Sequence, residues 1–374
     1  MNTSQKSILI LTALASSSLL DAAIDLGRGT LITDINVVSE YTNNAQQAAN
    51  GEEDWINTLT PTLIYQSYGT EWQTNASLGV SFLSYSNQNQ DNENINFSAS
   101  ASHPRGISFS GGVSETTGGD SEFGQVVSTR NYSFSATISY KLTPKIPVST
   151  GFSYSLRQPL DDSNGIQRNE TESISIPFNI SIPIHDKITV GYAFGMQQTN
   201  GQNGGGDSKS TTHSVFASVT DDIFPRVTGN LSLGAQMRLS DQGDQFSPYA
   251  SGGLSWQAGA LTSVSMNLSA GFQNTTGNRI NRNMSISLGL NHKFPRNVSG
   301  NISAGLSSNE YADIGQAEEF TRKDTSWNIG AGLSTTVYEH TNLMLSLNYS
   351  RSNSDQSNSQ FNSYSIRFSA NRPF

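Results

Sequence analysis

The chain has 374 residues, of which 34% are hydrophobic and 14% charged, with no cysteine and a formal net charge of −9. The lack of cysteine excludes disulfide bonds, thiolate catalysis and cysteine-ligated metals, and the negative charge argues against a general nucleic-acid-binding protein. The 17 phenylalanines, 13 tyrosines and 4 tryptophans argue against disorder, because disordered chains are poor in aromatic residues.

The N-terminus has the layout of a secretory signal peptide. Residues 1–6 are polar with one positive charge, and residues 7–20 form an apolar run rich in small residues, SILILTALASSSLL. This run is too short to cross a bilayer as a helix. We therefore expect a signal peptide over residues 1–23, with an approximate cleavage position, and one mature domain over residues 24–374.

Apolar and polar residues alternate along the whole mature chain, and this period of two is typical of β-strands with two different faces. Helical periodicity is nearly absent, so the sequence predicts an all-β protein. Within residues 78–85 the apolar residues change from even-numbered to odd-numbered positions, which predicts a β-bulge. The clearest alternating segments are residues 132–142, 174–184, 264–272, 284–290, 327–337, 343–349 and 364–370.

Short and long connectors follow one another in strict alternation between these segments. The short connectors are residues 67–71, 103–106, 142–147, 185–187, 221–226, 258–260, 293–297 and 338–341. The long, polar connectors are residues 42–54, 86–94, 115–129, 158–172, 198–211, 240–246, 273–282, 307–324 and 351–361. Eight short and nine long connectors separate 18 strands, within an expected range of 16–20.

This arrangement predicts a transmembrane, antiparallel, up-and-down β-barrel. Outer-membrane barrels have short periplasmic turns at one end and longer extracellular loops at the other, and a spanning strand needs about 9–11 residues. The barrel must be closed, because lipid cannot satisfy the hydrogen bonds of a free strand edge. A wide barrel with a wet interior also explains why overall hydrophobicity is low although aromatic residues are plentiful.

The closing segment YSIRFSANRPF resembles the C-terminal assembly signal of Gram-negative outer-membrane β-barrel proteins, which ends in phenylalanine after alternate apolar positions. Ile366, Phe368, Ala370 and Phe374 match this pattern, and Arg372 departs from it. The length of the chain and its alternation of strands with short and long connectors are similar to those of the porin-like barrels. The resemblance implies location in the bacterial outer membrane, contact with lipid and lipopolysaccharide, recognition by the barrel-assembly machinery, and a monomer or homotrimer.

The residues that alternate with the apolar ones are mostly Ser, Asn, Thr and Gly, which suits the lining of a wide lumen. Arg157, Arg238 and Arg367 have the inward parity. They either favour the passage of anions or bond to loops near the strand ends. Residues 306–323 are the best candidate for a constriction loop, although we favour a solvated surface loop for them.

No cofactor, metal site or catalytic site is expected. Four of the five histidines fall in short turns or directly beside one, and the neighbouring pair His213–Ser214 is too common a pattern to indicate a hydrolase. The sequence predicts a passive, porin-like channel for small hydrophilic solutes with a weakly charged polar lumen. The alternatives are an exopolysaccharide-associated or surface-binding barrel that acts through its loops, and a secreted all-β adhesin.

Overall fold

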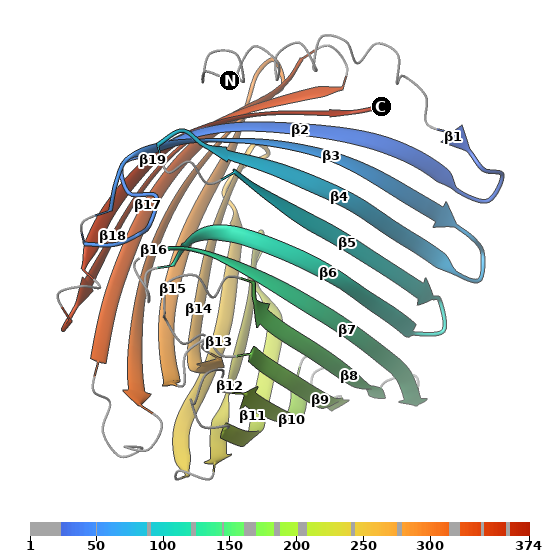
Figure 1. Ribbon diagram of the computed structural model, residues 1–374. Coiled ribbons are helices and arrows are strands. Elements are labelled where there is room, and N and C mark those ends of the chain that lie inside the picture. The colour runs from blue at the N-terminus through green and yellow to red at the C-terminus, as the bar shows by residue number, and fades with distance from the viewer. Residues whose placement is uncertain are drawn as a thin grey trace.

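The computed structural model describes residues 24–49, 51–87, 91–120, 125–143, 146–160, 170–182, 188–200, 208–240, 244–274, 279–313, 322–337, 340–356 and 360–374. The signal peptide expected over residues 1–23 lies outside the described residues. The described chain is a single twisted sheet that curls into a barrel (Figure 1).

Nineteen strands make up the sheet among the described residues. They are β1 (Ile24–Asp25), β2 (Thr30–Thr42), β3 (Asp54–Tyr68), β4 (Gln73–Tyr85), β5 (Asp91–His103), β6 (Ile107–Asp120), β7 (Gln125–Thr143), β8 (Ile146–Pro159), β9 (Glu170–Ile182), β10 (Ile188–Asn200), β11 (Ser208–Phe224), β12 (Val227–Ser240), β13 (Gln245–Gln257), β14 (Thr262–Asn274), β15 (Arg279–Phe294), β16 (Val298–Asp313), β17 (Arg322–Val337), β18 (Thr341–Ser354) and β19 (Phe361–Pro373).

The ring is closed and every pairing in it is antiparallel. Each strand from β2 to β19 pairs with its neighbours in sequence, and β19 pairs back onto β2. The two-residue strand β1 adds only to the edge of β2 and is not part of the ring. The predicted closed barrel of 18 strands is therefore confirmed. Among the described residues, no helix is long and apolar enough to cross a membrane.

The two faces of the wall differ in chemistry as the alternation predicts. On β15, Ile286 and Leu288 point outward and are exposed, whereas Ser285 and Ser287 alternate with them on the inner face. Only seven hydrophobic residues of the described chain are buried. A soluble fold would bury far more apolar surface, so the apolar belt of this barrel faces its surroundings.

The strands are longer than a bilayer requires. Those of the ring run from 13 to 19 residues, compared with the roughly 9–11 needed to span the hydrocarbon. The extra residues take up much of the long connectors: the connector predicted at residues 115–129 is mostly strand, in β6 and β7. The polar residues there still form the backbone hydrogen bonds between β6 and β7, so the wall of the barrel continues beyond the apolar belt.

Three prolines inside strands mark interruptions of the ladder, because proline has no N–H to donate. The β3–β4 ladder skips the pair that would join Pro61 to Val80, and the β8–β9 ladder skips the pair that would join Pro177 to Gly151. The β13–β14 ladder ends at Ala250–Ala270, two residues short of Pro248.

The bulge predicted in residues 78–85 is wrong. Strand β4 keeps one register with both neighbours, and among the described strands register shifts occur only at Lys141/Thr143 and Asp222/Phe224. The parity changes because the apolar side chains of Leu83 and Tyr85 point inward, where both line a pocket. The slip in the sequence marks a packing site inside the barrel.

The C-terminal residue closes the ring. The Phe374 N–H donates to the Thr33 carbonyl at 2.7 Å, and the Thr33 N–H donates back at 3.3 Å. Ile366 and Phe368 are exposed on the outer face, as expected. Phe374 is only 8% exposed, because the guanidinium of Arg372 lies 4.8 Å from its ring centroid. The final ring is therefore covered, unlike the Ile366 and Phe368 side chains, which are open to the surroundings.

Candidate functional site

The inner wall of the barrel is lined by hydroxyl groups that bond to one another across neighbouring strands. Ser110 and Ser135 have their Oγ atoms 2.6 Å apart, and Ser269 and Ser285 have theirs 2.7 Å apart. Each such pair uses one of the hydrogen-bonding sites of each hydroxyl, and the remaining donor and acceptor sites are directed at the lumen. The lining is therefore polar but carries no charge at these positions.

Asparagine side chains lie flat against this wall because glycine stands opposite them. A Cβ atom added at Gly305 would meet the Asn328 Oδ1 atom at 2.4 Å, which shows that the amide occupies the space of the missing side chain. This pairing keeps the lumen wide while presenting amide groups to it. Five cross-strand pairs share the arrangement: Gly191–Asn179, Gly253–Asn230, Gly305–Asn328, Gly330–Asn348 and Gly332–Asn301.

The register places all three predicted arginines on the inner face of the wall. Arg367 stands opposite Glu40 of β2 and is exposed to a pocket that both residues line. Arg157 stands opposite Thr171. Arg238 is only 7% exposed, and its Nε has no hydrogen-bond partner among the described residues. An effect of these arginines on anion passage remains a prediction.

The connector between β2 and β3 folds into the barrel, which the sequence analysis did not predict. Asn44, only 5% exposed, organises it. Its Nδ2 donates to the Ala48 carbonyl at 2.8 Å and to the Asn362 carbonyl of β19 at 3.2 Å, while its Oδ1 accepts from the Ala48 N–H. The Ala45 N–H closes the base by donating to the Glu52 carbonyl at 3.0 Å. The loop is therefore built by its own hydrogen bonds.

This inward loop, residues 43–53, reaches β6 and covers a polar pocket. A Cβ atom at Gly119 of β6 would lie 2.4 Å from the Ala45 carbonyl oxygen, so only glycine allows the contact. Beneath the loop, residues of β2, β3, β4, β6, β18 and β19 line a cavity of about 450 Å³. The small residues of AQQAANG are the only sequence signal for this close approach. The inward loop narrows the lumen at its long-loop end.

Residues 306–323, the candidate constriction loop, form strand over most of their length. Residues 306–313 continue β16, residues 322–323 begin β17, and residues 314–321 lie outside the described residues. The described part of the segment is not a loop, because this polar stretch keeps the ladder up to the pair Tyr311–Arg322. Arg322 forms a buried ion pair with Asp324 at 2.5 Å and lies 5.0 Å from the Tyr311 ring centroid. This end of the wall is therefore held by its own side chains.

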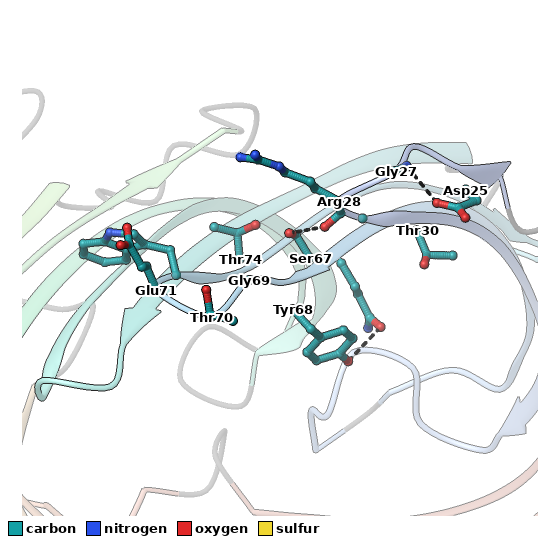
Figure 2. Close-up of a pocket in the computed structure, with 13 residues that line it drawn as sticks. Asp25, Gly27, Arg28, Thr30, Ser67, Tyr68, Gly69, Thr70, Glu71 and Thr74 are labelled. Carbon is teal, nitrogen blue, oxygen red and sulfur yellow. Dashed lines mark hydrogen bonds between the residues drawn. The ribbon is translucent and has the colours of Figure 1, made fainter.

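A hollow of about 900 Å³ lies at the opposite, short-turn end (Figure 2). It is formed by the β1–β2 connection and the β3–β4 turn. The Ser67 hydroxyl donates to the Arg28 carbonyl and so joins the two connections, while the Tyr68 hydroxyl donates to the Gln66 side chain within β3. Figure 2 shows the Arg28 side chain extended from this rim. The hollow is an open vestibule at the mouth of the barrel.

Aromatic rings form an outer belt near the long-loop end, as the girdle of a membrane barrel requires. Trp327 and Tyr349 have ring centroids 5.0 Å apart, and Tyr41 and Trp55 have theirs 5.3 Å apart. We take the membrane-spanning part of each strand to end at this belt.

Beyond the belt, three charged residues face outward in one row across β15, β16 and β17. Glu310 accepts hydrogen bonds from Arg282 and lies 3.4 Å from the Lys323 Nζ atom. The bond from Arg282 is the main reason why the pKa of the Glu310 carboxyl lies below its usual range, and Lys323 contributes in the same direction. The row leaves one excess positive charge at the level of lipid head groups.

Histidine 213 is not placed for hydrolytic chemistry. It lies inside β11 rather than at a strand entry, and its Nδ1 atom is 2.7 Å from the Tyr192 hydroxyl. Ser214, the next residue, faces the lumen and bonds to Gln236. The two side chains therefore point to opposite sides of the wall.

Comparison with known proteins agrees with this architecture. A family model described as "Putative beta-barrel porin 2" matches residues 203–371, which run from just before β11 into β19. Over this part, which is a little under half of its length, the chain is similar to porin-type β-barrels. None of the curated proteins matches it.

Several solved Pseudomonas aeruginosa porins share the fold. The outer membrane protein OpdK is 12% identical, with a TM-score of 0.51 over 92% of this chain and 98% of its own. OccK2 (OpdF) is 9% identical, with a TM-score of 0.55 over 92% and 98%. OpdL is 11% identical, with a TM-score of 0.52 over 93% and 99%. At these identities the likeness concerns the fold. In such a barrel the short turns are periplasmic and the long loops extracellular.

Proposed function

We propose that this porin-type barrel is a passive channel for small, hydrophilic and mainly uncharged solutes, without catalytic activity. The observation that carries the proposal is the closed 18-strand ring whose inner face is a ladder of hydroxyl and amide groups. A ring of this size is too wide for side chains to fill. OpdK and OccK2 have been crystallised with vanillate and with glucuronate, so barrels of this shape accommodate small solutes.

The proposal is tested with purified protein in planar lipid bilayers. We expect discrete, voltage-independent conductance steps with weak ion selectivity, because the described lining has few unpaired charges. The loss of this conductance after heat denaturation of the same preparation is the control. A correctly folded, heat-modifiable barrel that conducts at no voltage would contradict the proposal and favour a barrel that acts through its loops. The outward apolar belt already disfavours a secreted adhesin.

We also propose the partners that outer-membrane assembly requires. A signal peptide over residues 1–23 directs export, and the C-terminal strand, with Ile366, Phe368, Ala370 and Phe374, is the address for the barrel-assembly machinery. Lipopolysaccharide phosphates meet the outward Arg282 and Lys323 above the aromatic belt. A homotrimer is the assembly state proposed beside the monomer, and light scattering in detergent distinguishes the two.

A further inference from the structure

Two aromatic side chains stand at one level of the inner wall, among inward residues of β10–β14 that are otherwise small or polar. Phe216 of β11 is paired with Gly234 of β12, and Gly234 is paired with Tyr249 of β13. All three positions therefore face the lumen side by side. The two ring centroids are 5.6 Å apart, with the ring planes tilted by 44°.

Glycines on the neighbouring strands leave room for the side chains at this level of the wall. A Cβ atom at Gly191 of β10 would be 2.2 Å from the Phe216 Cζ atom, so only glycine leaves space for that ring. One at Gly271 of β14 would be 2.7 Å from the Gln236 Oε1 atom and in ordinary contact, 3.5 Å, with the Tyr249 Cδ2 atom, so Gly271 makes room for the amide beside the Tyr249 ring. A row of five residues, Gly191, Phe216, Gly234, Tyr249 and Gly271, thus crosses the five adjacent strands β10–β14 at one level. We call Phe216 and Tyr249 with these three glycines the aromatic strip.

A column of polar groups rises from the strip along β12, in the direction of the long loops. Gln236 donates to the Ser214 hydroxyl at 3.2 Å and accepts from the Phe272 N–H at 2.9 Å. The Phe272 N–H is available because it stands opposite Pro248, where the β13–β14 ladder has already ended. Two residues further along, Arg238 is buried with its Nε unpartnered among the described residues.

The strip lies across the lumen from the inward loop. In the ring of 18 strands, β12 is the ninth strand from β3 in either direction, and Figure 1 shows the two on opposite sides of the barrel. A solute that passes the inward loop therefore meets a wall that offers two aromatic rings, an amide, a hydroxyl and a guanidinium.

We infer that the aromatic strip is a saccharide-binding site within the channel; this inference rests on the proposed channel function. A pyranose ring is complementary both to the aromatic rings of the strip and to the polar groups beside them. Its face carries partly positive C–H groups, which pack against the partly negative faces of aromatic rings. Its rim carries hydroxyl groups, which exchange hydrogen bonds with amides, hydroxyls and guanidinium donors. A hydrated ion has no apolar face, and an alkane has no rim of hydroxyls.

The test compares D-glucose with sorbitol in proteoliposomes. The two solutes have the same number of carbons, but only glucose is a rigid ring with a flat C–H face. Initial influx rates are measured for the wild type and for Phe216→Leu and Tyr249→Leu, which keep apolar volume without an aromatic face. We expect the glucose-to-sorbitol rate ratio at low solute concentration to fall by about threefold to tenfold in the variants, the range expected for loss of an aromatic contact.

Matched controls separate the two proposals from each other. Phe216→Tyr and Tyr249→Phe keep both rings and should keep the wild-type ratio. Ion conductance is recorded for every protein: its absence from the folded wild type would sink the channel function itself. Normal conductance with a ratio that the leucine variants leave unchanged would overturn the saccharide site and make the strip a packing feature of the wall.

A measurement on the wild type covers the case in which the leucine variants fail to fold. Saturation-transfer NMR in detergent with maltose as the probe should show strongest transfer to the ring protons of one pyranose face, through contact with aromatic protons. Equal, weak transfer to maltose and sorbitol would contradict the inference without any substitution.

Discussion

Asp54 shows how one residue secures the extracellular end of this wall. Its side chain is fully buried, and its carboxylate accepts the N–H groups of Ser86 and Asn87 at 2.8 and 3.0 Å. A buried carboxylate is tolerated only where hydrogen bonds replace its water. Here those bonds connect β3 to the connector after β4, so the residue holds two extracellular segments together.

We predict that Asp54→Ala destabilises the barrel by about 1–3 kcal/mol, since it leaves two backbone donors without their acceptor. The urea midpoint of the heat-modifiable band measures the loss. Glu52→Gln removes a charge from an exposed neighbour and should leave the midpoint in place. Equal midpoints for Asp54→Ala and the wild type would show that the carboxylate contributes nothing to stability.

At the scale of the element, the inward loop narrows the channel at its long-loop end. The loop is held by Asn44 and by the contact of Ala45 with Gly119. Residues of the loop and of six strands line the cavity under it. Because the loop organises its own hydrogen bonds, it can be removed without removing a strand.

Replacing residues 45–52 by two glycines should raise single-channel conductance, because the loop then no longer fills part of the lumen. Glu53→Gln is the matched control, since Glu53 belongs to the same loop but bonds outward to the Tyr41 hydroxyl at 2.7 Å. Unchanged conductance in the shortened protein would place the narrowest section of the channel elsewhere.

The charged row across β15–β17 should make the extracellular rim sensitive to acid. The pKa of Glu310 is lower in the folded barrel than in the unfolded chain, where a glutamate titrates near pH 4.3, an approximate reference value. The row therefore stabilises the barrel above that pH, and the stabilisation is lost as the pH falls through the folded value.

Glu310→Gln should abolish this part of the pH dependence and cost at most about 1 kcal/mol at neutral pH, since the pair is partly exposed. Urea midpoints between pH 7 and pH 3 for both proteins measure the difference. Parallel curves for the variant and the wild type would exclude a role of Glu310 in acid sensitivity.

At the scale of the whole molecule, stability depends on closure of the ring between β19 and β2. Nine residue pairs join these strands, and the two hydrogen bonds between Thr33 and Phe374 extend the seam to the last residue. Arg372, which departs from the usual terminal pattern, covers the final ring and so protects this end of the seam.

Deletion of Phe374 should lower the amount of barrel that assembles in the outer membrane, while the barrels that do assemble keep their conductance. Phe374→Tyr is the matched control, because it keeps the ring under Arg372. Outer-membrane fractions with and without heating measure assembly. Wild-type amounts of the truncated protein would show that the terminal residue is not part of the assembly address.

Much of this architecture could be predicted because it depends on contacts between neighbours. Residues such as Phe134 and Ser135 alternate in chemistry, so strand, period and outward face follow from adjacent positions. The alternation of short and long connectors likewise predicted 18 strands, each beside the next. Connector lengths were overestimated, since polar residues beyond the apolar belt still form ladder hydrogen bonds.

The sequence by itself determined a two-faced wall and the order of its strands, because both arise from local periodicity and from the need to satisfy every backbone group in lipid. Only the tertiary structure decided what lies inside. Ala45 meets Gly119, Phe216 meets Tyr249 and Phe374 bonds to Thr33 through closure of the ring and the curvature of its wall. Such contacts join positions far apart in the chain, and no periodicity encodes them.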